Sequence, residues 1–189
     1  MPSGRTHDRI TWYLTPVMAG LSYLMTHQEH LTVLATGAFL FSGLMFGPDL
    51  DIHSVQYKRW GWLRWLWLPY RRLLRHRSLF SHGPIIGTFL RLCYLAIVLS
   101  GFLALLAAIA VLLGKIKLAE LSRIPQMIGQ LGWHYLPESL ALLTGLELGS
   151  ISHILSDRLG SRLKRLQASR KKKKPSGKSS KRDQRGKRK

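Results

Sequence analysis

Long uncharged, mostly apolar runs alternate with short polar or basic stretches along this chain. The clearest run, Leu92 to Gly114, contains no charged residue and is as long as the roughly 20 apolar residues that a helix needs to cross a bilayer. Ile10 to Thr26 and Leu31 to Gly47 are separated only by HQEH, which predicts a helical hairpin. A fourth run, Ser139 to Leu155, is interrupted by Glu147. The pattern predicts an all-α, integral-membrane helical bundle of about four transmembrane helices.

The fourth run carries two further signals. Gly145 and Gly149 form a small-xxx-small pair, which favours close packing against another helix. Glu147 lies between them, and a carboxylate inside a span is usually functional or paired, so the sequence leaves its role open.

Charge is distributed very unevenly along the 189 residues, whose net charge is +20. The stretch from Arg158 to Lys189 holds 16 Lys and Arg against one Asp, and it is nearly free of apolar residues after Leu166. We therefore predict a membrane-embedded domain over residues 1–166 and a disordered polybasic tail over 167–189. The tail is expected to adsorb to the anionic headgroups of membrane lipids; nucleic acid, whose binding uses the same electrostatics, is a possible but less favoured partner.

The positions of Lys and Arg also predict the orientation of the spans. Outside the apolar runs, most of them fall in residues 1–9, 48–91 and 156–189. Basic loops are retained on the cytoplasmic side, so the pattern predicts a multi-pass protein with both termini cytoplasmic. The segment YKRWGWLRWLWLPYRR, residues 57–72, combines four tryptophans with basic residues and is expected to lie at the membrane interface.

Most of the chain's histidines and aspartates fall at the predicted cytoplasmic ends of the four runs. His153 and Asp157 are one helical turn apart and project from the same side of a helix. Histidine and carboxylate sets without cysteine suit zinc first, with Mn, Fe or Mg as alternatives, and the number of candidates would allow two ions. The predicted metal ligands are His7, Asp49, Asp51, His76, His82, His153 and Asp157.

Less specific explanations exist for each of these residues. The aspartates can be loop residues screened by arginines, and the histidines can be solvated or hydrogen-bonded within the bundle. A metal site is favoured because these residues come from four separate chain segments and are predicted to lie at the same depth in the membrane. Asp8 and His53 are expected to support the ligands rather than to bind the ion.

Four blocks of sequence carry a resemblance to a known family: MPSGRTHDRIT, GPDLDIHSVQYKRWG, LPYRRLLRHRSLFSHGP and SHILSD. They resemble a family of uncharacterised bacterial integral-membrane proteins described as predicted metal-binding, over roughly residues 1–160. That family is distantly similar to membrane-bound metal-dependent hydrolases, whose pattern is an Asp-rich turn, an HR-x-x-x-x-H-type pair and a late His-x-x-x-Asp. The resemblance implies a bacterial membrane location and the same seven ligands.

Three functions are compatible with these observations. The first is a metal-dependent hydrolase acting on a phosphoester or a lipid-linked substrate, with Arg75 and Arg77 beside His76 to bind an anionic group. The second is a non-catalytic metal-binding or metal-handling membrane protein. The third is a membrane tether that binds anionic partners through the basic tail. The ligand set alone does not decide between the first two, because it does not show whether a coordination position is open to substrate.

Overall fold

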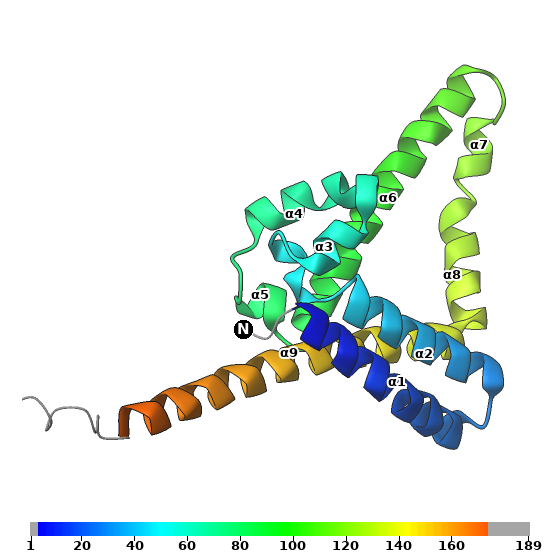
Figure 1. Cartoon of the computed structure of the whole chain (residues 1–189). Coiled ribbons are helices and arrows are strands. Elements are labelled where there is room, and N and C mark those ends of the chain that lie inside the picture. Colours follow the sequence, from blue (N-terminus) through cyan, green and yellow to red (C-terminus); the bar gives the residue numbers. More distant parts are fainter. Residues whose placement is uncertain (1–3, 174–189) are drawn as a thin grey trace, which may run out of the picture.

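The computed structural model describes residues 4–173, and all regular structure among them is helical (Figure 1). Four helices are long: α1 (Gly4–Thr26), α2 (Glu29–Leu44), α6 (Ile86–Leu112) and α9 (Leu136–Lys173). Between α2 and α6 the chain forms five short helices, η1 (Pro48–Asp51), α3 (Val55–Arg59), η2 (Gly61–Trp67), α4 (Leu68–Leu73) and α5 (Leu79–His82). Between α6 and α9 it forms α7 (Leu118–Leu121) and α8 (Ile124–His134).

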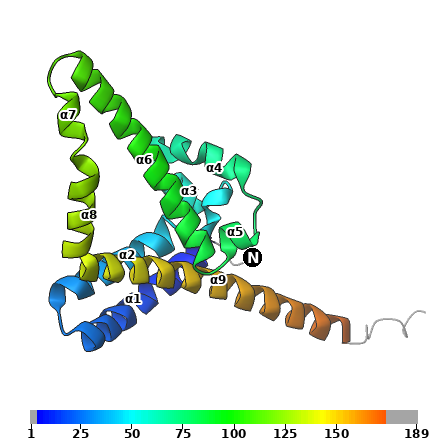
Figure 2. The ribbon, with the colours of Figure 1, turned by 180° about the vertical axis from the view of Figure 1, so that it is seen from behind.

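The helices α1, α2 and α9 pack side by side, whereas α6 diverges from them (Figures 1 and 2). The predicted hairpin of the first two runs is present as α1 and α2. The segment from Lys115 to Glu138, which joins the third and fourth predicted runs, forms α7, α8 and the beginning of α9, which return the chain from the far end of α6. The arrangement is therefore a three-helix group with a projecting arm rather than a compact four-helix bundle.

The glycine pair on α9 packs against α2, as its spacing predicts. A Cβ atom at Gly145 would lie 2.1 Å from the carbonyl oxygen of Ala35, and one at Gly149 would lie 2.5 Å from that of Phe39. Ser42 Oγ of α2 donates a hydrogen bond to the Leu146 carbonyl over 2.6 Å. Only glycine allows the two backbones to approach this closely, and the close approach fixes α9 against the end of α2.

Three helical segments within the described residues are long and apolar enough to cross a membrane: Glu29–Asp51, Ile86–Leu112 and Leu136–Leu163. They correspond to the second, third and fourth predicted runs. The first run is helical in α1 but does not reach the same apolarity, because polar side chains are spread along it. The described chain thus has three candidate spans, and a fourth through α1 stays a prediction.

The tryptophan-rich segment is divided between a core and an exposed surface. Trp62 and Trp65 are exposed, as expected of an interfacial segment, but Trp67 is fully buried. The buried cluster on this side of the molecule consists of Phe46, Leu50, Tyr57, Trp67 and Tyr70. Burial raises the pKa of Tyr70 to about 12, so its phenol stays neutral at physiological pH. These aromatic residues therefore also form the core of the region between α2 and α6, which carries the loops of the site.

Glu147 has a partner in this fold. Its Oε1 accepts a hydrogen bond of 2.8 Å from the backbone N–H of Ile85, in the turn that precedes α6. Ile85 has a φ of 65°, which is strained for a β-branched residue. Glu147 therefore holds that turn against α9, which gives the interrupting carboxylate of the fourth run a structural role.

At the C-terminal end, α9 extends to Lys173. Residues 167–173 of the predicted tail are thus part of a helix, and residues 174–189 lie outside the described residues. The predicted disorder of that remaining stretch stays a prediction.

Candidate metal centre

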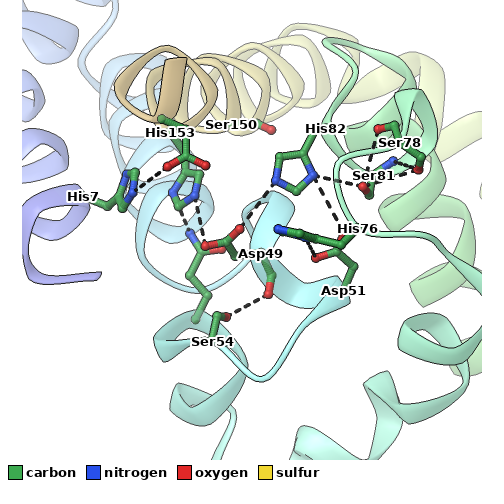
Figure 3. A network of polar contacts seen from close by, with 12 residues as sticks. His7, Asp49, Asp51, Ser54, His76, Ser78, Ser81, His82, Ser150 and His153 are labelled. Atoms are coloured by element: carbon green, nitrogen blue, oxygen red, sulfur yellow. Dashed lines mark hydrogen bonds and ion pairs between the residues drawn. The ribbon is translucent and has the colours of Figure 1, made fainter. Parts of the chain in front are cut away.

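Five elements bring the predicted ligands to one place (Figure 3). His7 lies in the second turn of α1, and His153 and Asp157 lie one turn apart near the middle of α9. Pro48 occupies the first turn of η1, where its fixed φ and missing N–H are tolerated, and this short helix presents Asp49 and Asp51. The loop after α4 supplies one more histidine, His76, and the last residue of α5 is His82.

The first group of side chains consists of His7, His153 and Asp157, and all three are buried. His7 Nε2 lies 3.2 Å from Asp157 Oδ1. The rings of His7 and His153 are stacked, with centroids 4.0 Å apart and an interplanar angle of 18°. One ligand atom from each of the three residues lies within 4.8 Å of the others, so the group can hold a metal ion.

The second group consists of Asp49, His76 and His82, and its members are partly buried. His82 Nε2 lies 3.5 Å from Asp49 Oδ1. The rings of His76 and His82 meet edge to face, with centroids 4.8 Å apart. This group also has one ligand atom per residue within 4.8 Å of the others.

Asp49 connects the two groups. One of its carboxylate oxygens, Oδ1, faces His82 of the second group, while Oδ2 lies 3.3 Å from Nε2 of His153 in the first group (Figure 3). A carboxylate with one oxygen toward each of two ligand sets is placed as a bridge between two ions would be.

Neighbouring polar groups hold the histidine rings in orientation. The Nδ1 atom of His7 contacts Ser156 Oγ, that of His76 contacts Asp51 Oδ1 at 2.9 Å, and that of His82 contacts Ser81 Oγ at 2.9 Å. Hydroxyl and carboxylate oxygens accept an Nδ1–H, and this tautomer leaves Nε2 free as a metal ligand.

His153 differs from the other three histidines. Its Nδ1 faces the Nε2 amide nitrogen of Gln56 at 3.4 Å, and the same amide donates to the Gly43 carbonyl over 2.8 Å. Because an amide N–H donates, this contact makes Nδ1 the acceptor and places the ring proton on Nε2, toward Asp49, so ligation through Nε2 would require the other tautomer.

Asp51 lies outside both groups, although it contacts both histidines of the second group. Its Oδ1 makes the hydrogen bond to His76, and its Oδ2 is 3.8 Å from His82 Nδ1. This is the arrangement of a carboxylate that orients a ligating histidine from behind. The sequence grouped Asp51 with the ligands because spacing alone does not show which ring atom a carboxylate will meet.

Unpartnered polar atoms mark the same place. Within the described residues, buried side-chain atoms without a hydrogen-bond partner include Asp49 Oδ1, His82 Nε2, His153 Nε2 and both carboxylate oxygens of Asp157. Buried polar atoms are normally hydrogen-bonded, so such a concentration is expected where a ligand binds. Cations that accept electron pairs from both imidazole nitrogen and carboxylate oxygen would provide the partners for these atoms.

The nitrogen–oxygen distances fit a shared ion better than they fit hydrogen bonds. Two ligands bound at about 2.1 Å to a tetrahedral ion lie about 3.4 Å apart. The three imidazole–carboxylate pairs His7–Asp157, His153–Asp49 and His82–Asp49 are separated by 3.2, 3.3 and 3.5 Å. Nitrogen and oxygen donors without cysteine suit zinc, manganese or iron. The residues present therefore fit a divalent metal.

The remaining predicted residues lie at the edge of the centre. Asp8 is engaged by Arg59, whose Nη1 donates to Oδ1 over 2.9 Å, so it does not contact the histidines. His53 is exposed and its ring lies 5.4 Å from that of Tyr57. Arg75 does not line either of the two cavities described below, whereas Arg77 lines the larger one.

Buried Arg91 is a supporting residue that the sequence did not single out. From α6 its guanidinium donates to the Ser81 carbonyl (3.2 Å), Thr88 Oγ1 (2.9 Å) and Ser150 Oγ (2.8 Å). It thereby joins α5, α6 and α9 directly behind His82. The available signal was a single arginine at the start of a long apolar run. It was counted among the basic residues of 48–91 that predicted the orientation of the spans.

Two cavities reach the centre. One of about 260 Å³ is lined by His7, Asp49 and His153, and the other, of about 500 Å³, is lined by His82 and Asp157. Side chains of both groups thus line a cavity, although those of the first group are buried.

Taken as a class, residues 4–173 form an all-helical structure with three candidate spans and a His/Asp centre that fits a metal ion. Residues 2–167 match the family described as "Uncharacterized metal-binding protein (DUF2227)", and the chain belongs to this family. An uncharacterised protein of Aquifex aeolicus (strain VF5) is 40% identical over 58 residues, which cover 30% of this chain and 40% of that protein. The match thus spans less than half of this curated relative. No solved structure matches the chain significantly.

These comparisons confirm the metal-binding part of the resemblance. The integral-membrane and hydrolase parts stay predictions.

Proposed function

We propose that the protein is a membrane-embedded, metal-dependent hydrolase whose centre binds two divalent ions. The observation that carries this proposal is the position of Asp49, with one carboxylate oxygen toward each group of ligands. Paired metal sites that share a ligand are typical of enzymes that hydrolyse phosphoesters.

The ligand roles follow from the contacts. His7, His153 and Asp157 would hold one ion, and His76 and His82 the other, with Asp49 placed to contribute to both. Asp51 keeps His76 in its ligating tautomer. Zinc is the preferred ion because the donors are imidazole and carboxylate groups, with Mn, Fe or Mg as alternatives.

A bound divalent cation supplies Lewis acidity to such a reaction. The protein supplies position and access: the second group is only partly buried and lines the larger cavity through His82, so a substrate reaches it from outside. The first group is buried on all three members and is better suited to a permanently held ion.

That burial also favours a second candidate function, a metal-binding protein without catalysis. A closed set of ligands is typical of structural metal sites, whereas a catalytic site keeps one position open. The two candidates differ in whether a substrate is hydrolysed. In the hydrolase, His82, which faces the cavity, would be needed for turnover, whereas in the non-catalytic protein it would only bind metal.

The membrane placement belongs to the same proposal. We place α2, α6 and the first part of α9 in the bilayer of a bacterial membrane, with both termini in the cytoplasm and the centre at that face. Exposed leucine, isoleucine and phenylalanine side chains along α6 support this, since a surface so apolar is unfavourable in water.

The test combines metal analysis with a hydrolysis assay on detergent-purified full-length protein. We expect about two equivalents of metal, and cation-dependent hydrolysis of a chromogenic phosphoester. His7→Ala and His82→Ala should each lose one equivalent, because they belong to different groups. His134→Ala is the matched control, since His134 is exposed on α8 and outside the centre.

Wild-type protein without stoichiometric metal would refute the metal centre. Full metal content without hydrolysis of any phosphoester or lipid ester would favour the non-catalytic candidate.

A further inference from the structure

The larger cavity beside the metal centre is lined by four arginines, whereas the lining of the smaller one includes a single lysine and no arginine. It has a volume of about 500 Å³ and lies between α5 and α9, beside His82 and Asp157. Its four arginines come from the loop before α5 and from α9: Arg77, Arg158, Arg162 and Arg165.

The α9 arginines continue the same helix that carries the metal-centre residues. Arg158 follows Asp157 directly, and Arg162 and Arg165 come one and two turns later on the same side of the helix. The three arginines therefore form a row along one side of α9 that begins next to Asp157 of the metal centre.

These arginines lack the carboxylate partners that usually accompany such a cluster. Among the described residues, no ion pair involves any of the four. The cavity's one carboxylate is Asp157, which lies 3.2 Å from His7 and belongs to the metal centre. Like charges that line one hollow repel each other, so an anionic ligand would be attracted there.

Apolar side chains also line the cavity. Leu79, which is 63% exposed, and Pro84 lie on the α5 side, and Ile154 comes from α9. The cavity thus combines arginines, apolar side chains and, at one end, two residues of the metal centre.

We propose that this cavity binds the phosphate group of the substrate, with the α9 arginines as its anion-binding residues. This rests on the proposed function, because it supplies the substrate class for the same centre. Guanidinium forks match phosphate oxygens, and several arginines around one ligand favour a multiply charged group over a single carboxylate. The apolar side chains accommodate the body of the molecule that carries the phosphate.

The test measures phosphate binding directly by calorimetry on metal-loaded, full-length protein in neutral detergent. The ligands are dihexanoyl phosphatidic acid, inorganic phosphate and dihexanoylglycerol, which lacks the phosphate. The variant Arg158→Gln/Arg162→Gln removes two of the cavity's charges. Its matched control is Arg182→Gln/Arg185→Gln, which removes the same charge from the basic C-terminal region.

We expect the cavity variant to weaken phosphatidic acid binding by about tenfold or more, since hydrogen bonds to charged groups are lost. The control should stay within about twofold of wild type. Arg77→Asn, on the other wall, should also weaken binding, and asparagine tolerates the φ of 60° at this position. Metal content and thermal unfolding of each variant show that the fold is retained.

Each outcome decides the proposal. Tighter binding of phosphatidic acid than of inorganic phosphate supports a lipid-linked phosphate, and equal binding supports a soluble phosphoester. Equal losses in the cavity variant and its control, no loss in either, or equal binding of dihexanoylglycerol would overturn the proposal. Arginine-dependent phosphate binding by protein without stoichiometric metal would refute the proposed function while leaving the phosphate site intact.

Discussion

Asp49→Asn is the substitution that separates the two groups of ligands most directly. The carboxylate lies 3.3 Å from His153 Nε2 and 3.5 Å from His82 Nε2, one oxygen toward each. Asparagine keeps the shape but replaces one oxygen with an amide nitrogen, which cannot ligate, and it removes the negative charge. Replacing one oxygen by nitrogen should therefore lower the metal affinity of both groups.

The expected magnitude follows from the position of Asp49 among the ligands. Loss of a residue that only supports a ligand typically costs 10- to 100-fold in metal affinity, and Asp49 faces the ligating atoms themselves. We therefore expect a loss of at least about 100-fold, which corresponds to about 2.7 kcal/mol. Under dilute conditions the bound metal should fall from two equivalents to one or none.

The assay is competition against a chromophoric chelator of known affinity, together with elemental analysis of the purified variant. Glu120→Gln is the control, because it removes one negative charge from an exposed residue of α7, away from the centre. Unchanged affinity and stoichiometry in Asp49→Asn would refute the bridging role. So would an equal loss in Glu120→Gln, since the effect would then be one of net charge.

Three further predictions concern stability. Gly149→Ala should destabilise the fold by about 1–3 kcal/mol in thermal unfolding, because the new Cβ would lie 2.5 Å from a backbone oxygen. In the control Gly37→Ala the new Cβ meets nothing within 4 Å, so this change should be neutral or stabilising. Equal effects of the two substitutions would contradict the packing argument. Metal removal by a chelator should lower the midpoint of unfolding, because unpartnered buried atoms lose their ion, and added zinc should restore it; an unchanged midpoint would contradict this. Glu147→Ala should lower the free energy of unfolding by about 1–2 kcal/mol and speed hydrogen exchange at the Ile85 amide, because the hydrogen bond is lost. Glu147→Gln keeps an oxygen acceptor and should leave both close to wild type. If it does not, the hydrogen bond is not the cause.

Helix positions were predictable from the sequence, but helix ends were less so. Uncharged runs located α2, α6 and the first half of α9, because apolar length is the property that hydropathy measures. The run beginning at Ile10 missed the first turns of α1, and the run ending at Leu155 missed the second half of α9. Those parts are polar, and a polar helix that packs at a site has no hydropathy signal.

The direction of α6 was not predictable at all. Its sequence is uniformly apolar, so no face is marked for packing against α1, α2 or α9. What fixes its position is local: buried Arg91 near its start, and the Ile85 turn held by Glu147.

The site could be predicted as a set of residues but not as a set of roles. Topology placed His7, Asp49, His82 and His153 at one end of the helices, and the structure brings them into contact there. The assignment of Asp51 to His76 depends on which ring nitrogen it meets, which only tertiary geometry determines. Polar partners such as Gln56, in the short helix α3, are ordinary polar residues, and nothing in their spacing marks them.

The α9 arginines show why composition alone was misleading at the centre's edge. Arg158, Arg162 and Arg165 belong by composition to the basic C-terminal stretch, so their charge was attributed to that stretch and not to the site. Their spacing of four and three continues the helical register of Ile154, which lines the same cavity, and that register was informative only once α9 was known to extend beyond Leu155. One helix thus carries metal-centre residues in its apolar half and cavity arginines immediately afterward. A charge run that begins within one turn of a predicted ligand should therefore be tested as part of the site before it is assigned to the tail.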